Sequence, residues 1–234
     1  ARQINALNLG VRLEINETGQ GFNLVNEVSG FELSVSENGG GTLLATRLGL
    51  RTFTNTTSVA DLNHGRGVEI ADGEIDPISG LPHPTRNVDF RVHLQDGNSF
   101  DVDLVPADLT DVQGILDAVN AAAAGAGFGG VFTATLGDGA NGLRFEDTSG
   151  PVVQNTSVES LHGYAAEDLG LLDSSFTAGA PAVLAGSDRA TVRVESVFSD
   201  MIDLRDSLTG NDERGIVLAA SRLEEDEGRL ITAR

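Results

Sequence analysis

The sequence predicts an α+β fold, with small β-hairpin and helix modules in tandem followed by a carboxyl-terminal amphipathic helical segment. Three observations predict it. The order of features along residues 4–50 is repeated along residues 119–171. Pairs of alternating apolar and polar segments flank a helical pattern in the second copy, which is typical of an α+β module. From Arg189 onward the spacing of apolar residues becomes helical.

The internal repeat consists of an apolar-Asn pair, two alternating segments, a Ser-Gly pair and a final Leu-Gly-Leu. We interpret the apolar-Asn pair as the close of a helix and the alternating segments as two strands. Two copies with different loop lengths predict two similar small modules. The matching landmarks are Ile4-Asn5 and Val119-Asn120, Val11 to Ile15 and Val131 to Leu136, Phe22 to Val25 and Leu143 to Glu146, Ser29-Gly30 and Ser149-Gly150, and Leu48-Gly49-Leu50 and Leu169-Gly170-Leu171.

The second copy has a hairpin and a helix on its amino side. Residues 88–94 and 100–104 alternate around Asp96-Gly97, and this dipeptide between alternating segments is a strong hairpin signal. Thr110 and Gln113 have capping-box spacing, so we expect a helix to begin there. Small residues from 121 to 130 would end this helix. Its apolar stripe would consist of Val112, Ile115, Leu116 and Val119.

A second hairpin is expected over residues 131–136 and 143–147, around a glycine-rich turn. The order strand, strand, helix, strand, strand predicts a helix lying on one face of a sheet. We therefore divide the chain into a partial first module (1–50), a complete second module (51–173), a small-residue linker (174–188) and a helical segment (189–234).

The helical segment is expected to form two amphipathic helices, over residues 191–208 and 213–234, separated by a break at residues 209–212. Two helices of unequal polarity cover each other incompletely, so a partner helix is expected from missing segments or from another subunit. The residues expected to form this subunit-packing face are Val194, Val197, Phe198, Met201, Leu208, Ile216, Leu223 and Leu230.

Composition excludes several classes of protein and partner. The 234 residues include no cysteine, which removes disulfide scaffolds, thiolate metal sites and cysteine nucleophiles. The formal net charge of −20 would repel phosphate backbones and anionic lipid, so neither nucleic acid nor a membrane is an expected partner. No window approaches the length of apolar sequence that spans a bilayer.

Motifs that would carry catalysis or bind a cofactor or metal are not expected to function here. Two glycine patterns, Gly125 to Gly130 and Gly137 to Gly142, match a dinucleotide fingerprint by letter but lie outside the strand-to-helix context that the chemistry needs. Asp72, Glu74 and Asp76 have the spacing of a calcium loop, yet Pro77 replaces the required glycine. We expect no enzymatic activity, no cofactor and no metal.

The repeated modules with their lead-in, and the carboxyl-terminal helical stretch, resemble the flagellin family. The Ile4-Asn5 and Val119-Asn120 junctions, each followed by two strands and a Ser-Gly, are similar to the repeated module named after its Ile-Asn pair in bacterial flagellins and hook-associated proteins. Residues 58–68 resemble the lead-in to such modules. Residues 197–208, continuing with Asn211-Asp212, resemble the start of the carboxyl helical region of hook-filament junction members of the family.

This resemblance implies a structural protein of the bacterial flagellum that is exported and assembled outside the cell, joining hook to filament by helix packing. Its implied partners are other flagellar axial proteins, namely hook-associated proteins and flagellin, and copies of itself. The outward-facing β-rich modules would decorate the assembly. Two alternatives remain open: flagellin itself or the filament cap, and a secreted acidic module that binds glycan or calcium.

Overall fold

The computed structural model describes residues 2–15, 22–28, 33, 35–36, 44–48, 50, 52–63, 66–137, 141–187, 189 and 197–232. The fold is a mixture of α and β structure with several small antiparallel sheets and few helices. The chain divides into two compact units. One unit comprises residues 1–29, 42–50 and 192–234, and the other comprises residues 30–41 and 51–191.

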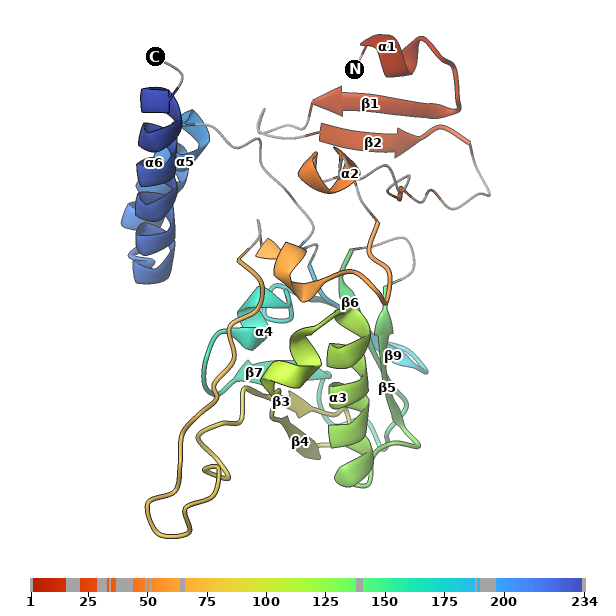
Figure 1. The fold of residues 1–234 in the computed structure, drawn as a ribbon. Coiled ribbons are helices and arrows are strands. Elements are labelled where there is room, and N and C mark those ends of the chain that lie inside the picture. Colours follow the sequence, from red (N-terminus) through yellow and green to blue (C-terminus); the bar gives the residue numbers. More distant parts are fainter. Residues whose placement is uncertain are drawn as a thin grey trace. The chain divides into compact units, whose positions relative to one another are not determined.

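The larger unit contains two antiparallel sheets (Figure 1). The first has the order β4-β3-β7, formed by Ser99–Val102, Phe90–His93 and Ser157–Ser160. The second has the order β5-β6-β9-β8, formed by Phe132–Leu136, Leu143–Asp147, Ala182–Ala185 and Ser175–Thr177. The two predicted hairpins, β3-β4 and β5-β6, are confirmed. Gly97 in the first turn has φ +89°, a conformation that glycine adopts without strain.

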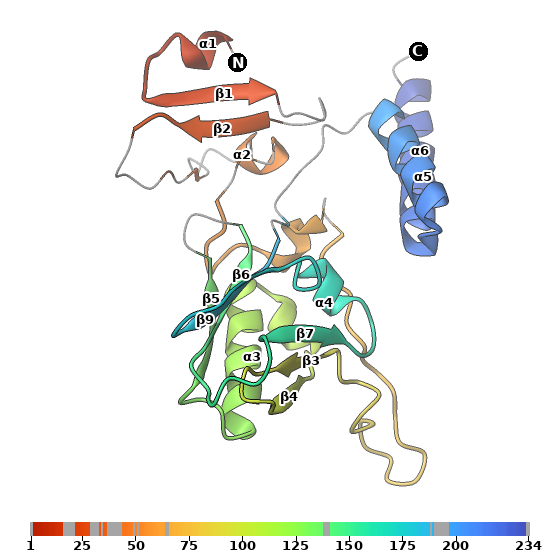
Figure 2. The ribbon, with the colours of Figure 1, turned by 180° about the vertical axis from the view of Figure 1, so that it is seen from behind.

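Helix α3 (Val112–Gly125) packs against strands of both sheets and completes the core of this unit (Figures 1 and 2). Its predicted stripe, which includes Ile115 and Val119, is buried. Phe132 joins the aromatic side chains of the two sheets, because the centre of its ring lies 4.9 Å from that of Phe100 and 5.3 Å from that of Phe145. Edge-to-face contacts of this kind are favoured by the ring quadrupoles.

Three expectations for this unit are corrected. The proposed linker over residues 174–188 contains strands β8 and β9, which extend the second sheet because β9 pairs with β6. The cap of α3 is Asp111, not Thr110, since its carboxylate accepts a hydrogen bond from the Gly114 amide at 3.0 Å. The Val119-Asn120 pair lies inside α3 and does not close it, because the following alanines continue the helix.

Short helical elements complete the larger unit. They are the 3₁₀ turns η1 (Val59–Asp61) and η3 (Pro106–Leu109) and the one-turn helix α4 (Ala165–Asp168). Leu169 and Leu171, which follow α4 directly, are buried in the same core.

The amino-terminal part of the smaller unit is a hairpin of β1 (Val11–Ile15) and β2 (Phe22–Asn26), as predicted. Helix α1 (Arg2–Asn5) precedes it and α2 (Leu44–Arg47) follows it. The carboxyl-terminal part consists of α5 (Val197–Gly210) and α6 (Glu213–Thr232). Residues 191–196, where the first helix was expected to begin, lie outside the described residues. Among the described helices, none is both long enough and apolar enough to cross a membrane.

Candidate subunit-packing surface

Helices α5 and α6 pack on each other through small and polar side chains. Asp203 of α5 faces Arg222 of α6 at 3.9 Å. Gly215 lies so close to α5 that an added Cβ would collide with the Ser207 hydroxyl. Ala219 of α6 is buried. Asp203 and Ser207 of α5 therefore face α6, and the small residues Gly215 and Ala219 of α6 allow the close approach.

The turn between these helices is fixed by local hydrogen bonds. Asn211 has φ +53°, which reverses the chain after α5. The Asp212 amide donates to the Ser207 carbonyl at 2.9 Å, and its carboxylate accepts from the Gly215 amide at 2.9 Å. Asp212 thus acts as the amino-terminal cap of α6. The break predicted over residues 209–212 is limited to residues 211–212, because α5 continues to Gly210.

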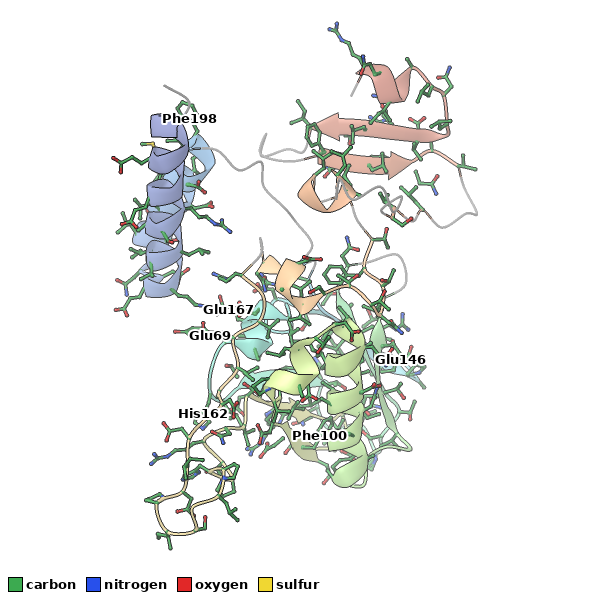
Figure 3. The ribbon with its side chains drawn as sticks, viewed as in Figure 1. Glu69, Phe100, Glu146, His162, Glu167 and Phe198 are labelled. Carbon is green, nitrogen blue, oxygen red and sulfur yellow. The ribbon has the colours of Figure 1, made fainter. Side chains whose placement is uncertain are left out.

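Three large apolar side chains of α5 are exposed, and we call them the α5 stripe: Phe198, Met201 and Leu208. They are 78%, 56% and 58% exposed, respectively, and Phe198 is labelled in Figure 3. Their spacing places them on one side of the helix. Asp203 and Ser207 lie on the opposite side, toward α6. Helix α5 therefore presents its apolar side away from α6, the reverse of the pattern expected for an isolated helical hairpin.

The other predicted packing residues are less accessible. Val197, Ile216 and Leu223 are half-buried, so they cannot contribute their full surface to a second partner. Val194 lies outside the described residues. Leu230 lies within α6, but its side chain is likewise outside what the structure describes.

Sequence reasoning missed one exposed apolar residue of α6. Val217 is 70% exposed, next to the half-buried Ile216. The spacing of three and four residues that joins Ile216, Ala219 and Leu223 passes over Val217. Only the small Ala220 follows Val217 at a spacing of three or four residues, so the periodicity carries little signal for this position.

The two Asn residues of the repeat make the same pair of hydrogen bonds. Asn5 donates from Nδ2 to the Leu13 carbonyl at 3.0 Å and accepts from the Leu13 amide at 2.8 Å. Asn120 donates to the Ala134 carbonyl at 2.9 Å and accepts from the Ala134 amide at 2.8 Å. We call each pair of bonds an asparagine clamp. Each clamp occupies backbone groups that a sheet edge would otherwise leave available for pairing.

Buried carboxylates in the larger unit bind backbone groups. Asp147 accepts from the amides of Gln95 and Ser149, both at 2.8 Å, and from the Thr156 hydroxyl at 2.7 Å. Asp89 accepts from the amides of Ala71 at 2.7 Å and Leu104 at 2.8 Å. Burial raises the pKa of Asp89 to about 6, although these hydrogen bonds act to lower it. These geometries explain how the acids position loops against the sheets.

The acidic loop that was compared with a calcium site uses its carboxylates locally. Asp76 accepts from the Ile78 amide at 2.8 Å and from the Ser79 hydroxyl at 2.9 Å. The bond from the Ile78 amide is the main reason that the pKa of Asp76 lies below its ordinary value. Glu74 lies 3.9 Å from Arg86. Within the described ranges, no group of three or more His, Cys, Asp or Glu side chains could hold a metal ion.

Comparisons with protein-family models, curated proteins and solved structures found no match. The features of the chain that bear on its function are the α5 stripe, the asparagine clamps and the net charge of −20.

Proposed function

We propose that this chain is a structural subunit of the bacterial flagellum, a member of the flagellin family that joins hook to filament. Its carboxyl-terminal helices would pack against other flagellar axial proteins and against copies of itself outside the cell. Its β-rich modules would face outward and catalyse no reaction. The single observation that carries this proposal is the exposure of the α5 stripe on the side of α5 opposite α6.

The α5 stripe supports subunit packing for an energetic reason. Fully burying a side chain such as Phe, Met or Leu contributes roughly 1.5–3 kcal/mol relative to leaving it in water. The contact between α5 and α6 leaves Phe198, Met201 and Leu208 largely in water. A helix from a neighbouring subunit would recover this energy, as helices do in bundles.

The asparagine clamps support the tandem-module part of the proposal. Leu13 is the third residue of five-residue β1, and Ala134 is the third residue of five-residue β5. Each strand pairs with the strand that follows it in the chain. The same side-chain chemistry at the same strand position favours two related modules, as the resemblance to the Ile-Asn repeats of the family implies.

The net charge of −20 fits a subunit that must remain unassembled until it docks. Like-charged surfaces repel one another and limit premature association of copies. At physiological ionic strength this repulsion is screened beyond about 8 Å. Close apolar contact through the α5 stripe could then dominate once subunits are held together.

The proposal is tested by placing a charge on the α5 stripe in the full-length protein. Met201→Glu should leave export intact but prevent incorporation at the hook-filament junction, because a desolvated carboxylate would face an apolar partner. Ser221→Glu, on an exposed position of α6, is the matched control and should incorporate normally. Normal incorporation of Met201→Glu would contradict the packing role.

Copy number separates the junction role from the closest alternative. A junction protein should be present as about one ring for each filament, whereas flagellin is present in thousands of copies. The Ile-Asn modules do not discriminate against the filament cap, but the helix that includes α5 favours flagellin or the junction protein. The other alternative, a secreted binding module, would be supported if calorimetric titration with calcium released or absorbed heat and calcium raised the melting temperature of the chain.

A further inference from the structure

The apolar face of the β1-β2 hairpin matches that of the β5-β6 hairpin residue for residue. In both hairpins the clamped residue is paired with the third residue of the next strand, Leu13 with Leu24 and Ala134 with Phe145. Side chains two residues apart share a face of a strand. The two faces are therefore Val11, Leu13, Ile15, Phe22 and Leu24 in one hairpin, and Phe132, Ala134, Leu136, Leu143 and Phe145 in the other.

The two faces differ in how well they are covered. In the β5-β6 hairpin, every residue of this face is buried except Leu136, which is half-buried. In the β1-β2 hairpin only Leu13 is buried, and Ile15 is 64% exposed. Because the two faces have similar apolar composition, the first hairpin lacks cover that the second one has.

Helix α3 provides that cover in the second hairpin. Val119, directly before Asn120, is 0% exposed, and Ile115 and Val112 continue the buried side of the helix toward its amino end. In the first hairpin Ile4 occupies the place of Val119 but is 38% exposed. Helix α1 has four residues and buries none of them.

We propose that the apolar face of the β1-β2 hairpin is a docking surface for an amphipathic helix that runs into Arg2 and packs as α3 does. This occupant is inferred from the internal repeat. In the second copy, the helix that carries the clamping Asn120 is α3, and α3 covers the apolar face of the β5-β6 hairpin. Apolar side chains eight and five residues before Asn5 would take the places of Val112 and Ile115. This inference does not depend on the proposed flagellar function.

A grafted helix tests the proposal in the 234-residue chain. The prefix Asp-Val-Gln-Gly-Ile, which copies residues 111–115, is added before Ala1 together with Ala1→Leu, so that the copied residues keep their spacing to the Asn. Hydrogen exchange of the β1-β2 amides should slow by about tenfold, which corresponds to roughly 1.4 kcal/mol. A matched prefix with Glu in place of Val and Ile should leave exchange unchanged.

Two results would overturn the proposal. The first is that the apolar prefix leaves hydrogen exchange of the β1-β2 amides unchanged, or slows it no more than the charged prefix does. The second is evidence that the α5 stripe of the same chain already covers the apolar face of the β1-β2 hairpin. If Phe198→Glu in the chain without a prefix speeds exchange of the β1-β2 amides, then α5 already covers this hairpin and no α3-like helix is required.

Discussion

Asn120 holds both backbone groups of Ala134, at 2.9 Å to its carbonyl and 2.8 Å to its amide. Ala134 lies in β5, which is the edge strand of its sheet. A neutral amide side chain is suited to this task because it carries one donor and one acceptor side by side. The clamp therefore closes a sheet edge and fixes α3 against β5 with one residue.

Removing the clamp should destabilise the larger unit. Asn120→Ala leaves the amide and carbonyl of Ala134, a 3% exposed residue, without these partners. An unsatisfied buried polar group costs about 1–3 kcal/mol. Urea unfolding should show a loss of this size, whereas Asn155→Ala, at an exposed position, should change stability by less than about 0.5 kcal/mol. Equal stability of the two variants would show that the clamp contributes nothing.

Stability should fall with rising pH because of Asp89. Burial raises the pKa of this carboxyl from 3.8 to about 6, so the folded chain retains a proton that the unfolded chain has released. Stability from this group is therefore lost as pH rises from about 4 to about 6. Asp89→Asn should remove this part of the pH dependence of the unfolding free energy, whereas Glu167→Gln, at an exposed acid, should retain it. If the unfolding free energy of Asp89→Asn changed with pH as steeply as that of the unmodified chain, Asp89 would not be the source of this pH dependence.

Two glycines of α6 should respond in opposite directions to alanine. Gly215→Ala places a methyl group against the Ser207 hydroxyl and the Asp212 carboxylate, which would have to move away from the Gly215 amide, so we expect loss of this helix cap at a cost of about 1 kcal/mol. Gly228→Ala has no atom within 4 Å of the new Cβ and should stabilise the helix by up to about 1 kcal/mol. Circular dichroism of thermal unfolding would measure both. Stabilisation by Gly215→Ala would show that the close helix approach is absent.

Local patterns were enough to predict the hairpins. The segments around Asp96-Gly97 alternate strictly, and one strand pairs with the next. The same reasoning failed at Ser175–Thr177 and Ala182–Ala185. These short segments flank Pro181 and consist mostly of small residues, so they have little periodicity of their own. Ala182–Ala185 becomes a strand by pairing with β6, which lies about 40 residues earlier in the chain, and Ser175–Thr177 then pairs with Ala182–Ala185. No local pattern encodes the pairing with β6.

Eight apolar residues were predicted to form one subunit-packing face, but only part of this face is exposed. Helical periodicity identifies the apolar residues of a helix that are expected to be buried, but it does not identify the helix that packs against them. Leu223 and Ile216 are half-buried, whereas Phe198 and Met201 remain largely in water. The side of α5 toward α6 was unpredictable because it uses Asp203 and Ser207, which a search for apolar spacing passes over. The asparagine clamp was likewise invisible, although the repeated apolar-Asn pair marked both of its positions.

Cysteine accessibility in assembled flagella tests the central claim most directly, because the chain contains no cysteine of its own. Met201→Cys and Ser221→Cys, one on the α5 stripe and one on an exposed position of α6, should both react rapidly with a thiol reagent in the isolated protein. In purified hook-filament junctions, we expect Met201→Cys to be protected while Ser221→Cys stays reactive. Rapid reaction of Met201→Cys in intact junctions would contradict burial of the α5 stripe between subunits.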